Sequence, residues 1–137
     1  GRFLELRHDV TLYPDVVPAL SALSKRFAVV AVSNGNADVS RLGIGSYFRG
    51  QISASTAGVK KPDRRIFHMA CELLKTDPAH VLHVGDHPLE DVIGAQQAGL
   101  RAAWVNRNGD DWTHDEKPHA EVHDLAQLVE MLDCVDR

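Results

Sequence analysis

Three carboxylates, Asp86, Glu90 and Asp91, follow an apolar run in the stretch HVLHVGDHPLEDVIGAQQAG, residues 80–99. A strand end that carries several carboxylates is electrostatically costly unless a cation neutralises them, and oxygen ligands of this kind suit Mg²⁺. The same residues also suit a helix start, where Asp86 would cap the helix and Glu90 and Asp91 would favour its positive end. The spacing alone leaves both interpretations open.

A second polar group, Ser33, Asn34 and Gly35, follows directly after the apolar run FAVVAV, residues 27–32. A serine hydroxyl and a backbone N–H can donate to the oxygens of an anion, and a glycine lets the chain turn close to it. The same three residues are also typical of an ordinary turn after a strand. The tripeptide therefore predicts either an anion cradle or a plain turn.

The apolar patterns around these groups predict strands that alternate with helices in an α/β fold. Continuous apolar runs are typical of strands buried in a parallel sheet, and apolar residues three or four apart indicate helices. Strands are predicted at 27–32, 51–55, 81–84 and 100–105, and helices at 15–25, 38–42, 63–75, from about 87 to 99, and after a polar loop at 106–119. Leu73 and Leu89 are expected to face inward from their helices. Ligands of such sheets bind beyond the carboxyl ends of the strands, where Ser33 and Asp86 fall.

The composition restricts the class of protein. With 137 residues, 44% of them hydrophobic, the chain suits one domain with one core. The formal charge of −4 and the scattered Lys and Arg residues argue against a nucleic-acid partner. The longest apolar run is too short to span a bilayer, and GRFLELRHD at the N-terminus has no signal-peptide core, so we expect no membrane partner and a cytoplasmic location.

His83 and His87 stand four residues apart, a spacing that suits zinc when both residues lie on a helix. His83 falls in a predicted strand, however, which separates the two rings in orientation. We therefore expect ordinary packing or surface histidines.

Three stretches in this order resemble signature motifs of the haloacid dehalogenase-like hydrolase superfamily: VVAVSNGN (29–36), GVKKPDRRIF (58–67) and VGDHPLEDVIGAQQAG (84–99). They are similar to the second, third and fourth motifs, and the intervals between them also fit. The tail NGDDWTHDEKPHAEVHDLAQL (108–128) is similar to the phosphatase branch that acts on flavin mononucleotide and related phosphorylated metabolites. The resemblance covers almost the whole chain, and it implies a Rossmannoid parallel sheet with helices on both faces.

The resemblance implies a phosphate site and a catalytic lysine. Ser33, Asn34 and Gly35 would bind the phosphate oxygens. Lys61 matches the motif lysine, which offsets negative charge on the nucleophile and on the phosphate during phosphoryl transfer. Lys60 beside it is expected to be a solvated neighbour.

The resemblance also implies a Mg²⁺ site. Asp86 matches a direct ligand of the metal. Asp91 matches the second acid of the GDxxxxD pattern, which orients metal-bound water or pairs with the lysine. Asp86 and Asp91 are therefore the expected metal residues, and Glu90 is expected to lie at the surface or behind them.

The nucleophile of the superfamily is the first aspartate of a DxDxT or DxDxV motif after the first strand, and no such motif stands in a suitable place here. VTLYPDVVPAL (10–20) is similar to the stretch where such chains re-enter the core after a helical cap. We therefore expect a fragment, with residues 1–14 as a remnant of the cap-to-core connection. Residues 15–137 would form an incomplete core domain that lacks the first strand and most of the cap. Since selectivity in this superfamily lies largely in the cap, no particular substrate is predicted.

Three functions follow from these observations. The first is the core of a Mg²⁺-dependent phosphatase of small phosphorylated metabolites that forms an aspartyl-phosphate, with this chain inactive alone. The second is a haloacid dehalogenase, which uses the same aspartate without a metal and usually lacks the acid matched by Asp86. The third is a non-catalytic binding or assembly module.

The missing first strand has a consequence for assembly. In the superfamily it lies between the strands predicted here at 27–32 and 81–84, so its absence would leave two unpaired strand edges. Either these two strands pair directly, or the exposed edges favour association into a homo-oligomer.

Overall fold

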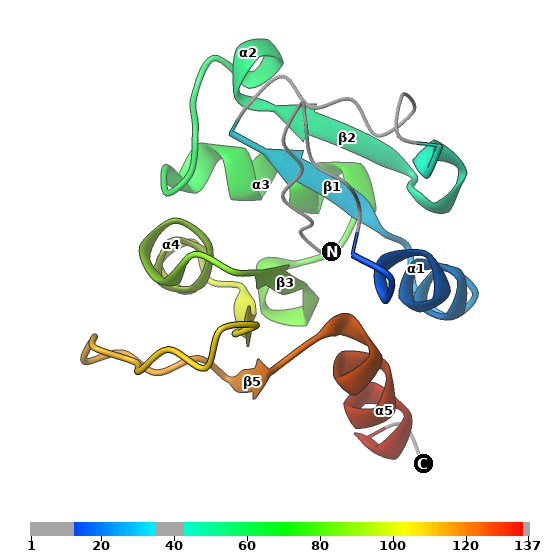
Figure 1. The fold of residues 1–137 in the computed structure, drawn as a ribbon. Coiled ribbons are helices and arrows are strands. Elements are labelled where there is room, and N and C mark those ends of the chain that lie inside the picture. The colour runs from blue at the N-terminus through cyan, green and yellow to red at the C-terminus, as the bar shows by residue number, and fades with distance from the viewer. Residues whose placement is uncertain (1–12, 35–42, 136–137) are drawn as a thin grey trace.

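The computed structural model describes residues 13–34 and 43–135, and Figure 1 shows how they are arranged. Gly35, the helix predicted over 38–42 and most of the connection predicted over 1–14 lie outside these residues. The division of the chain at residue 14 therefore stays a prediction.

Strands and helices alternate along most of the described residues, as the apolar patterns predicted, although two helices and two strands also follow one another directly. The strands are β1 (Val30–Ser33), β2 (Gly50–Ser53), β3 (Leu82–Gly85), β4 (Arg101–Val105) and β5 (Ala120–Val122). The α-helices are α1 (Val16–Ser24), α2 (Ala54–Ala57), α3 (Arg64–Leu74), α4 (Gly94–Gln97) and α5 (Leu125–Val135). Short 3₁₀ turns, η1 (Gly45–Tyr47) and η2 (Pro78–His80), and a π-helical turn, η3 (Pro88–Ile93), complete the order.

The strand pairs of the described residues are all parallel and form two sheets, in the orders β1–β2 and β3–β4–β5. Direct pairing of β1 with β3, one of the two closures expected, is thus not found among these residues. Side chains from both sides of this break line an apolar cavity of about 240 Å³, including Ala28 before β1, Leu82 and Val84 of β3, and Leu128 of α5. The α/β class and the parallel pairing are confirmed, but one continuous sheet is not.

Side chains of the strands alternate between two hydrophobic cores, because successive residues of a strand point to opposite faces. Val30 and Val32 of β1 pack in one core with α3, α4 and Trp104 of β4. Val29 and Ala31 pack in the other core with α1 and α5. Helices therefore cover both faces of the strands, as expected.

The prediction that Leu73 and Leu89 face inward is wrong, because these residues are 41% and 48% exposed. Leu89 lies in η3, where the N–H of Val92 donates to the carbonyl of His87, five residues back, at 3.3 Å. This wider turn breaks the α-helical period on which the prediction rests. Leu73 instead lies over Gly50 of β2, where a Cβ would come within 3.3 Å of the leucine Cδ1.

Two strand predictions also need correction. The strand expected from Phe27 begins at Val30, and Phe27 is 39% exposed. Strand β5 was not predicted, because its three residues are too few to show an alternating pattern.

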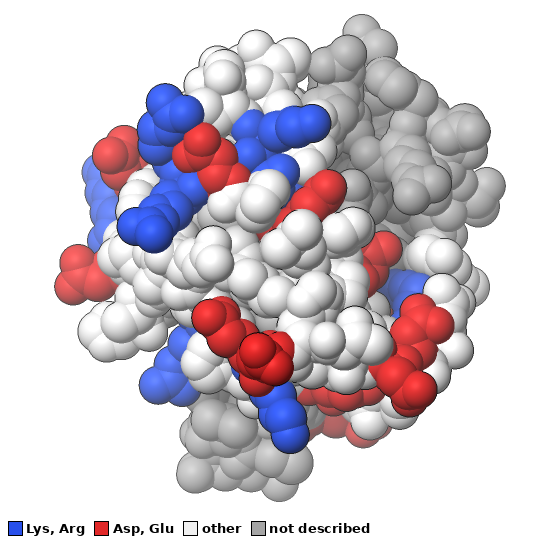
Figure 2. Space-filling view, turned by 90° about the vertical axis from the view of Figure 1, so that its left-hand side faces the viewer, with Lys and Arg blue, Asp and Glu red and all other residues white. Residues whose placement is uncertain are grey.

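The described surface carries both signs of charge. Figure 2 views the molecule from the side of α2 and α4, and Lys and Arg side chains there are interspersed with Asp and Glu. Within residues 13–34 and 43–135, no helix is both long enough and apolar enough to cross a membrane.

Candidate active site

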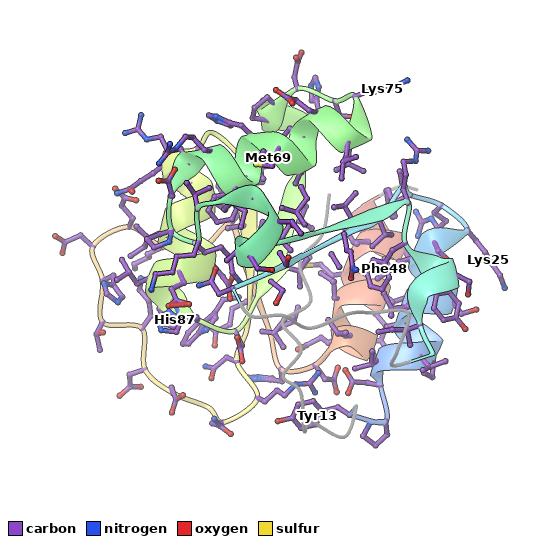
Figure 3. The ribbon with its side chains drawn as sticks, turned by 90° about the horizontal axis from the view of Figure 1, so that it is seen from above. Tyr13, Lys25, Phe48, Met69, Lys75 and His87 are labelled. Atoms are coloured by element: carbon purple, nitrogen blue, oxygen red, sulfur yellow. The ribbon has the colours of Figure 1, made fainter. Side chains whose placement is uncertain are left out.

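The polar residues that follow β1 and β3 lie at the same end of the strands. Ser33 is the last residue of β1, and Asp86 directly follows β3. Figure 3 shows His87 on the side of the molecule away from Lys25 and Phe48, which precede β1 and β2. This carboxyl end is the edge at which α/β sheets bind ligands, as the sequence predicted.

Lys61 reaches this edge from the turn between α2 and α3. Gly58 ends α2 with a left-handed φ of 77°, and the Asp63 side chain caps the start of α3. Gly94, at the start of α4, packs against the same turn, since a Cβ at this position would lie 2.8 Å from the Cβ of Pro62. The absence of a side chain at Gly94 therefore lets the segment that carries Asp91 approach the segment that carries Lys61.

Lys61 and Asp91 form a fully buried ion pair. The Nζ of Lys61 donates to Oδ1 of Asp91 at 2.8 Å, and both side chains have 0% exposure. Lys60 is exposed. Lys60 thus lies in solvent, as expected, whereas the burial of Lys61 was not predicted.

The carboxylate of Asp91 accepts two further hydrogen bonds. His83 Nε2 lies 3.1 Å from Oδ1, and the backbone N–H of His87 donates to Oδ2 at 3.1 Å. Burial alone raises the pKa of Asp91, but the hydrogen bond from His83 and the charge of Lys61 outweigh it, so the pKa lies below the ordinary value. Asp91 is therefore ionised at neutral pH although it is buried.

His83 is buried and uncharged at neutral pH. Burial lowers the pKa of His83 to about 4, although the hydrogen bond and the charge of Asp91 act in the opposite direction. The ring of Phe67 packs edge-on against it, with centroids 4.9 Å apart and an angle of 87° between the planes. The expectation of an ordinary packing histidine is therefore incomplete, because this ring also contacts the Lys61–Asp91 pair.

The side chain of Asn34 links the three polar stretches. Its Oδ1 accepts from the backbone N–H of Lys61 at 2.7 Å, and its Nδ2 donates to the carbonyl of Lys61 at 3.2 Å. The same Nδ2 donates to Oε1 of Glu90 at 3.0 Å. The segments of Ser33, Lys61 and Asp91, far apart in the sequence, are thus tied at one place.

Ser33 and Asp86 border this cluster in different ways. Ser33 is 6% exposed, whereas Asp86 is exposed at the end of β3. The backbone carbonyl of Asp86 accepts a hydrogen bond from Nε1 of Trp104 at 3.1 Å, which fixes the chain at this turn. Of the six site residues predicted from the sequence, Gly35 lies outside the described residues and the other five lie at this edge.

Sequence reasoning missed three contributors, namely His83, Glu90 as a partner of Asn34, and the indole of Trp104. A signal existed for His83, because a histidine inside the apolar run VLHV needs a buried polar partner. No such signal existed for Glu90 or Trp104, since their contacts depend on the tertiary packing of distant segments.

Comparison with known proteins places the chain in a class. The model of the haloacid dehalogenase-like hydrolase family matches residues 1–99. The chain therefore belongs to the haloacid dehalogenase-like hydrolases, as the three motif stretches indicated.

Two individual relatives of this chain are named as phosphatases. The chain is 33% identical to the Escherichia coli K12 protein named 5-amino-6-(5-phospho-D-ribitylamino)uracil phosphatase YigB, over 95% of this chain and 56% of the relative. It is 32% identical to a phosphoserine phosphatase of Thermus thermophilus, over 92% of this chain and 53% of that protein. The chain thus spans little more than half the length of these relatives.

Solved structures share the fold. A structure titled 2-haloacid dehalogenase, from Pseudomonas syringae pv. Tomato DC3000, superimposes with a TM-score of 0.90 at 45% identity, over 93% of this chain and 56% of that one. A phosphatase of the same superfamily from Thermococcus onnurineus superimposes with a TM-score of 0.78 at 31% identity, over 88% of this chain and 58% of that one. Relatives named as phosphatases and relatives named as dehalogenases therefore both resemble this chain.

Proposed function

We propose that this chain forms the core part of a phosphatase that acts on small phosphorylated metabolites. The observation that carries the proposal is the buried Lys61–Asp91 pair at the carboxyl end of the strands, tied by Asn34 to the end of β1. A buried lysine held in one place is a preorganised positive charge, and such a charge stabilises the anionic transition state of phosphoryl transfer.

Each residue of the edge has a role in this proposal. The hydroxyl of Ser33 and the backbone N–H of Asn34 bind the phosphate oxygens, and Gly35 lets the chain pass close to them. Lys61 offsets the charge of the phosphate and of the nucleophile, while Asp91 holds the ammonium group. The nucleophile is an aspartate from a part of the longer relatives that this chain does not span. Its carboxylate attacks the phosphorus while the ester P–O bond breaks, and the alcohol leaves with a proton from the second aspartate of the DxDxT motif. Water, deprotonated by that same aspartate, then attacks the aspartyl-phosphate, which releases phosphate and restores the nucleophile.

The residues described fit a Mg²⁺ ion only in part. Among them, no three His, Cys, Asp or Glu side chains come together as a metal site, and both oxygens of Asp91 already accept hydrogen bonds. Asp86 offers an exposed carboxylate at the end of β3, so we propose it as one ligand, with Asp91 acting behind it. When bound, Mg²⁺ would neutralise charge on the phosphate oxygens, and its other ligands would be water and carboxylates from elsewhere.

A haloacid dehalogenase is the second candidate. It is favoured by the similarity to the dehalogenase from Pseudomonas syringae, at 45% identity. Against it stands Asp86, the acid that such dehalogenases usually lack in the family pattern. Because both enzymes would use the same strand edge, substrate tests have to separate them.

The test uses a longer protein in which this chain is joined to the segment that carries the nucleophile. Phosphate release from a panel of phosphate monoesters is measured with and without Mg²⁺, beside halide release from 2-chloropropionate. We expect phosphate release that requires Mg²⁺ and is lost in Lys61→Met and Asp86→Asn. The exposed neighbour supplies the matched control, since Lys60→Met should retain full activity.

Each alternative has its own result. Halide release without metal would replace the phosphatase with a dehalogenase. Loss of activity in Lys60→Met, with Lys61→Met active, would overturn the assignment of the lysine. No turnover of either substrate class by the folded longer protein would favour the non-catalytic module.

A further inference from the structure

His83 contacts the Lys61–Asp91 pair, yet it lies outside the three motif stretches, which gave it no role. Its Nε2 lies 3.1 Å from the same Oδ1 atom that accepts from Lys61 at 2.8 Å. The residue is 3% exposed, so water does not compete for this contact. The backbone N–H of His87 holds the other oxygen, Oδ2, at 3.1 Å.

The chemistry of the contact fixes the form of the ring. An ionised carboxylate has no hydrogen to donate, so Nε2 of His83 carries the proton and donates it. The ring contributes a hydrogen bond without adding a charge.

The two oxygens of the Asp91 carboxylate are thus held by two different partners. His83 fixes Oδ1 and His87 fixes Oδ2, which together set the plane of the carboxylate. Lys61 then meets an acceptor whose position does not depend on the lysine itself. A flexible lysine gains precision from such a fixed acceptor.

We propose that His83 is a positioning residue, which acts through Asp91 to hold the ammonium group of Lys61 in one place. The inference rests on the proposed function for its catalytic meaning, since a fixed Lys61 matters to phosphoryl transfer. The structural claim itself concerns only this chain and needs no turnover.

The experiment follows Lys61 by NMR in the ¹⁵N-labelled 137-residue chain. Exchange of the Lys61 ammonium protons with water reports how firmly the group is held, and long-range ¹⁵N–¹H correlations report the tautomer of His83. Three variants are compared: His83→Met keeps the volume and removes the donor, His83→Gln keeps a donor at similar reach, and Phe67→Leu loosens the packing around the ring while His83 stays.

We expect His83 with its proton on Nε2, and at least about tenfold faster exchange of the Lys61 ammonium in His83→Met, since a hydrogen bond to a charged group is worth about this factor. His83→Gln should restore slow exchange. Phe67→Leu should lower the melting temperature but leave the exchange rate of Lys61 unchanged.

Three outcomes would overturn the inference: a proton on Nδ1 instead of Nε2, wild-type exchange in His83→Met, or equal acceleration in Phe67→Leu, which would make the effect one of packing. If His83→Met does not fold, His83→Gln decides, because slow exchange there supports the donor role and fast exchange refutes it. A longer protein without phosphatase activity would overturn the proposed function but leave these NMR results standing.

Discussion

Replacing Lys61 with methionine should strongly destabilise the chain. Methionine fills a similar volume, but the variant leaves the carboxylate of Asp91 buried without a cation. Removal of one partner of a buried ion pair typically costs about 3–5 kcal/mol. The two hydrogen bonds from His83 and from the His87 backbone remain, so we expect a loss toward the lower end of this range, about 3 kcal/mol.

The assay is urea denaturation at pH 7, followed by circular dichroism, with the free energy of unfolding taken by linear extrapolation. Lys60→Met is the control, because this neighbouring lysine is exposed and its loss should change stability by no more than about 0.5 kcal/mol. The double variant Lys61→Met/Asp91→Asn removes both charges, so it should recover at least about 1 kcal/mol of the loss.

A loss of less than about 1 kcal/mol in Lys61→Met, which is the range of exposed ion pairs, would refute this prediction. A second result would also refute it. In that result, Asp91→Asn lowers the free energy of unfolding by the same amount in the Lys61→Met variant as in the unaltered chain. The two residues would then act independently, and the buried pair would not be the unit that the structure shows.

Four further predictions concern other parts of the chain. Gly94→Ala should cost about 1–3 kcal/mol in denaturation, because a Cβ would come 2.8 Å from Pro62, whereas Gly50→Ala meets only the end of the exposed Leu73 side chain and should cost less. Burial alone would raise the pKa of Asp15, but two hydrogen bonds from Arg107 and one from the N–H of Leu125 together lower this pKa below 3.8. The contribution of Asp15 to the free energy of unfolding should therefore be full at neutral pH and decrease as the pH falls below 3.8. In Asp15→Asn, the loss of stability in acid should be smaller. Calorimetry at millimolar Mg²⁺ should detect weak binding that Asp86→Asn removes, and absence of such heat would withdraw the metal ligand. Sedimentation at micromolar concentration should show self-association through the apolar break between β1 and β3, which a stable monomer would refute.

The parts of the fold that were predicted correctly are those whose signal is local. The run around Val30 and Val32 is apolar on both faces of β1, and the capped segment after Asp63 has a helical stripe, so both elements could be read from neighbouring residues. Leu89 was placed wrongly because the π-helical turn changes the period, and no local pattern of residues predicts such a turn.

Within the site, too, the residues placed correctly are those whose positions have a local signal in the sequence. Ser33 and Asp86 could be placed from the sequence, because their positions at strand ends follow from the strands themselves. The link from Asn34 to Glu90 could not, since it joins residues 56 positions apart. Asp91 was expected either beside a metal or beside the lysine, and its contact with Lys61 in the structure favours the second arrangement.

The burial of the Lys61–Asp91 pair is itself an argument about its purpose. Taking both charges out of water costs several kcal/mol per ion, and apolar residues of similar volume often stabilise a core as well or better. Phe67, Val84 and Val92, at neighbouring positions, are buried and apolar, so apolar residues in place of the ion pair would have apolar neighbours. Stability alone therefore does not account for a lysine, an aspartate and a histidine at this point. Their position at the carboxyl end of β3, where ligands of α/β folds bind, gives the charge a use that an apolar cluster could not serve.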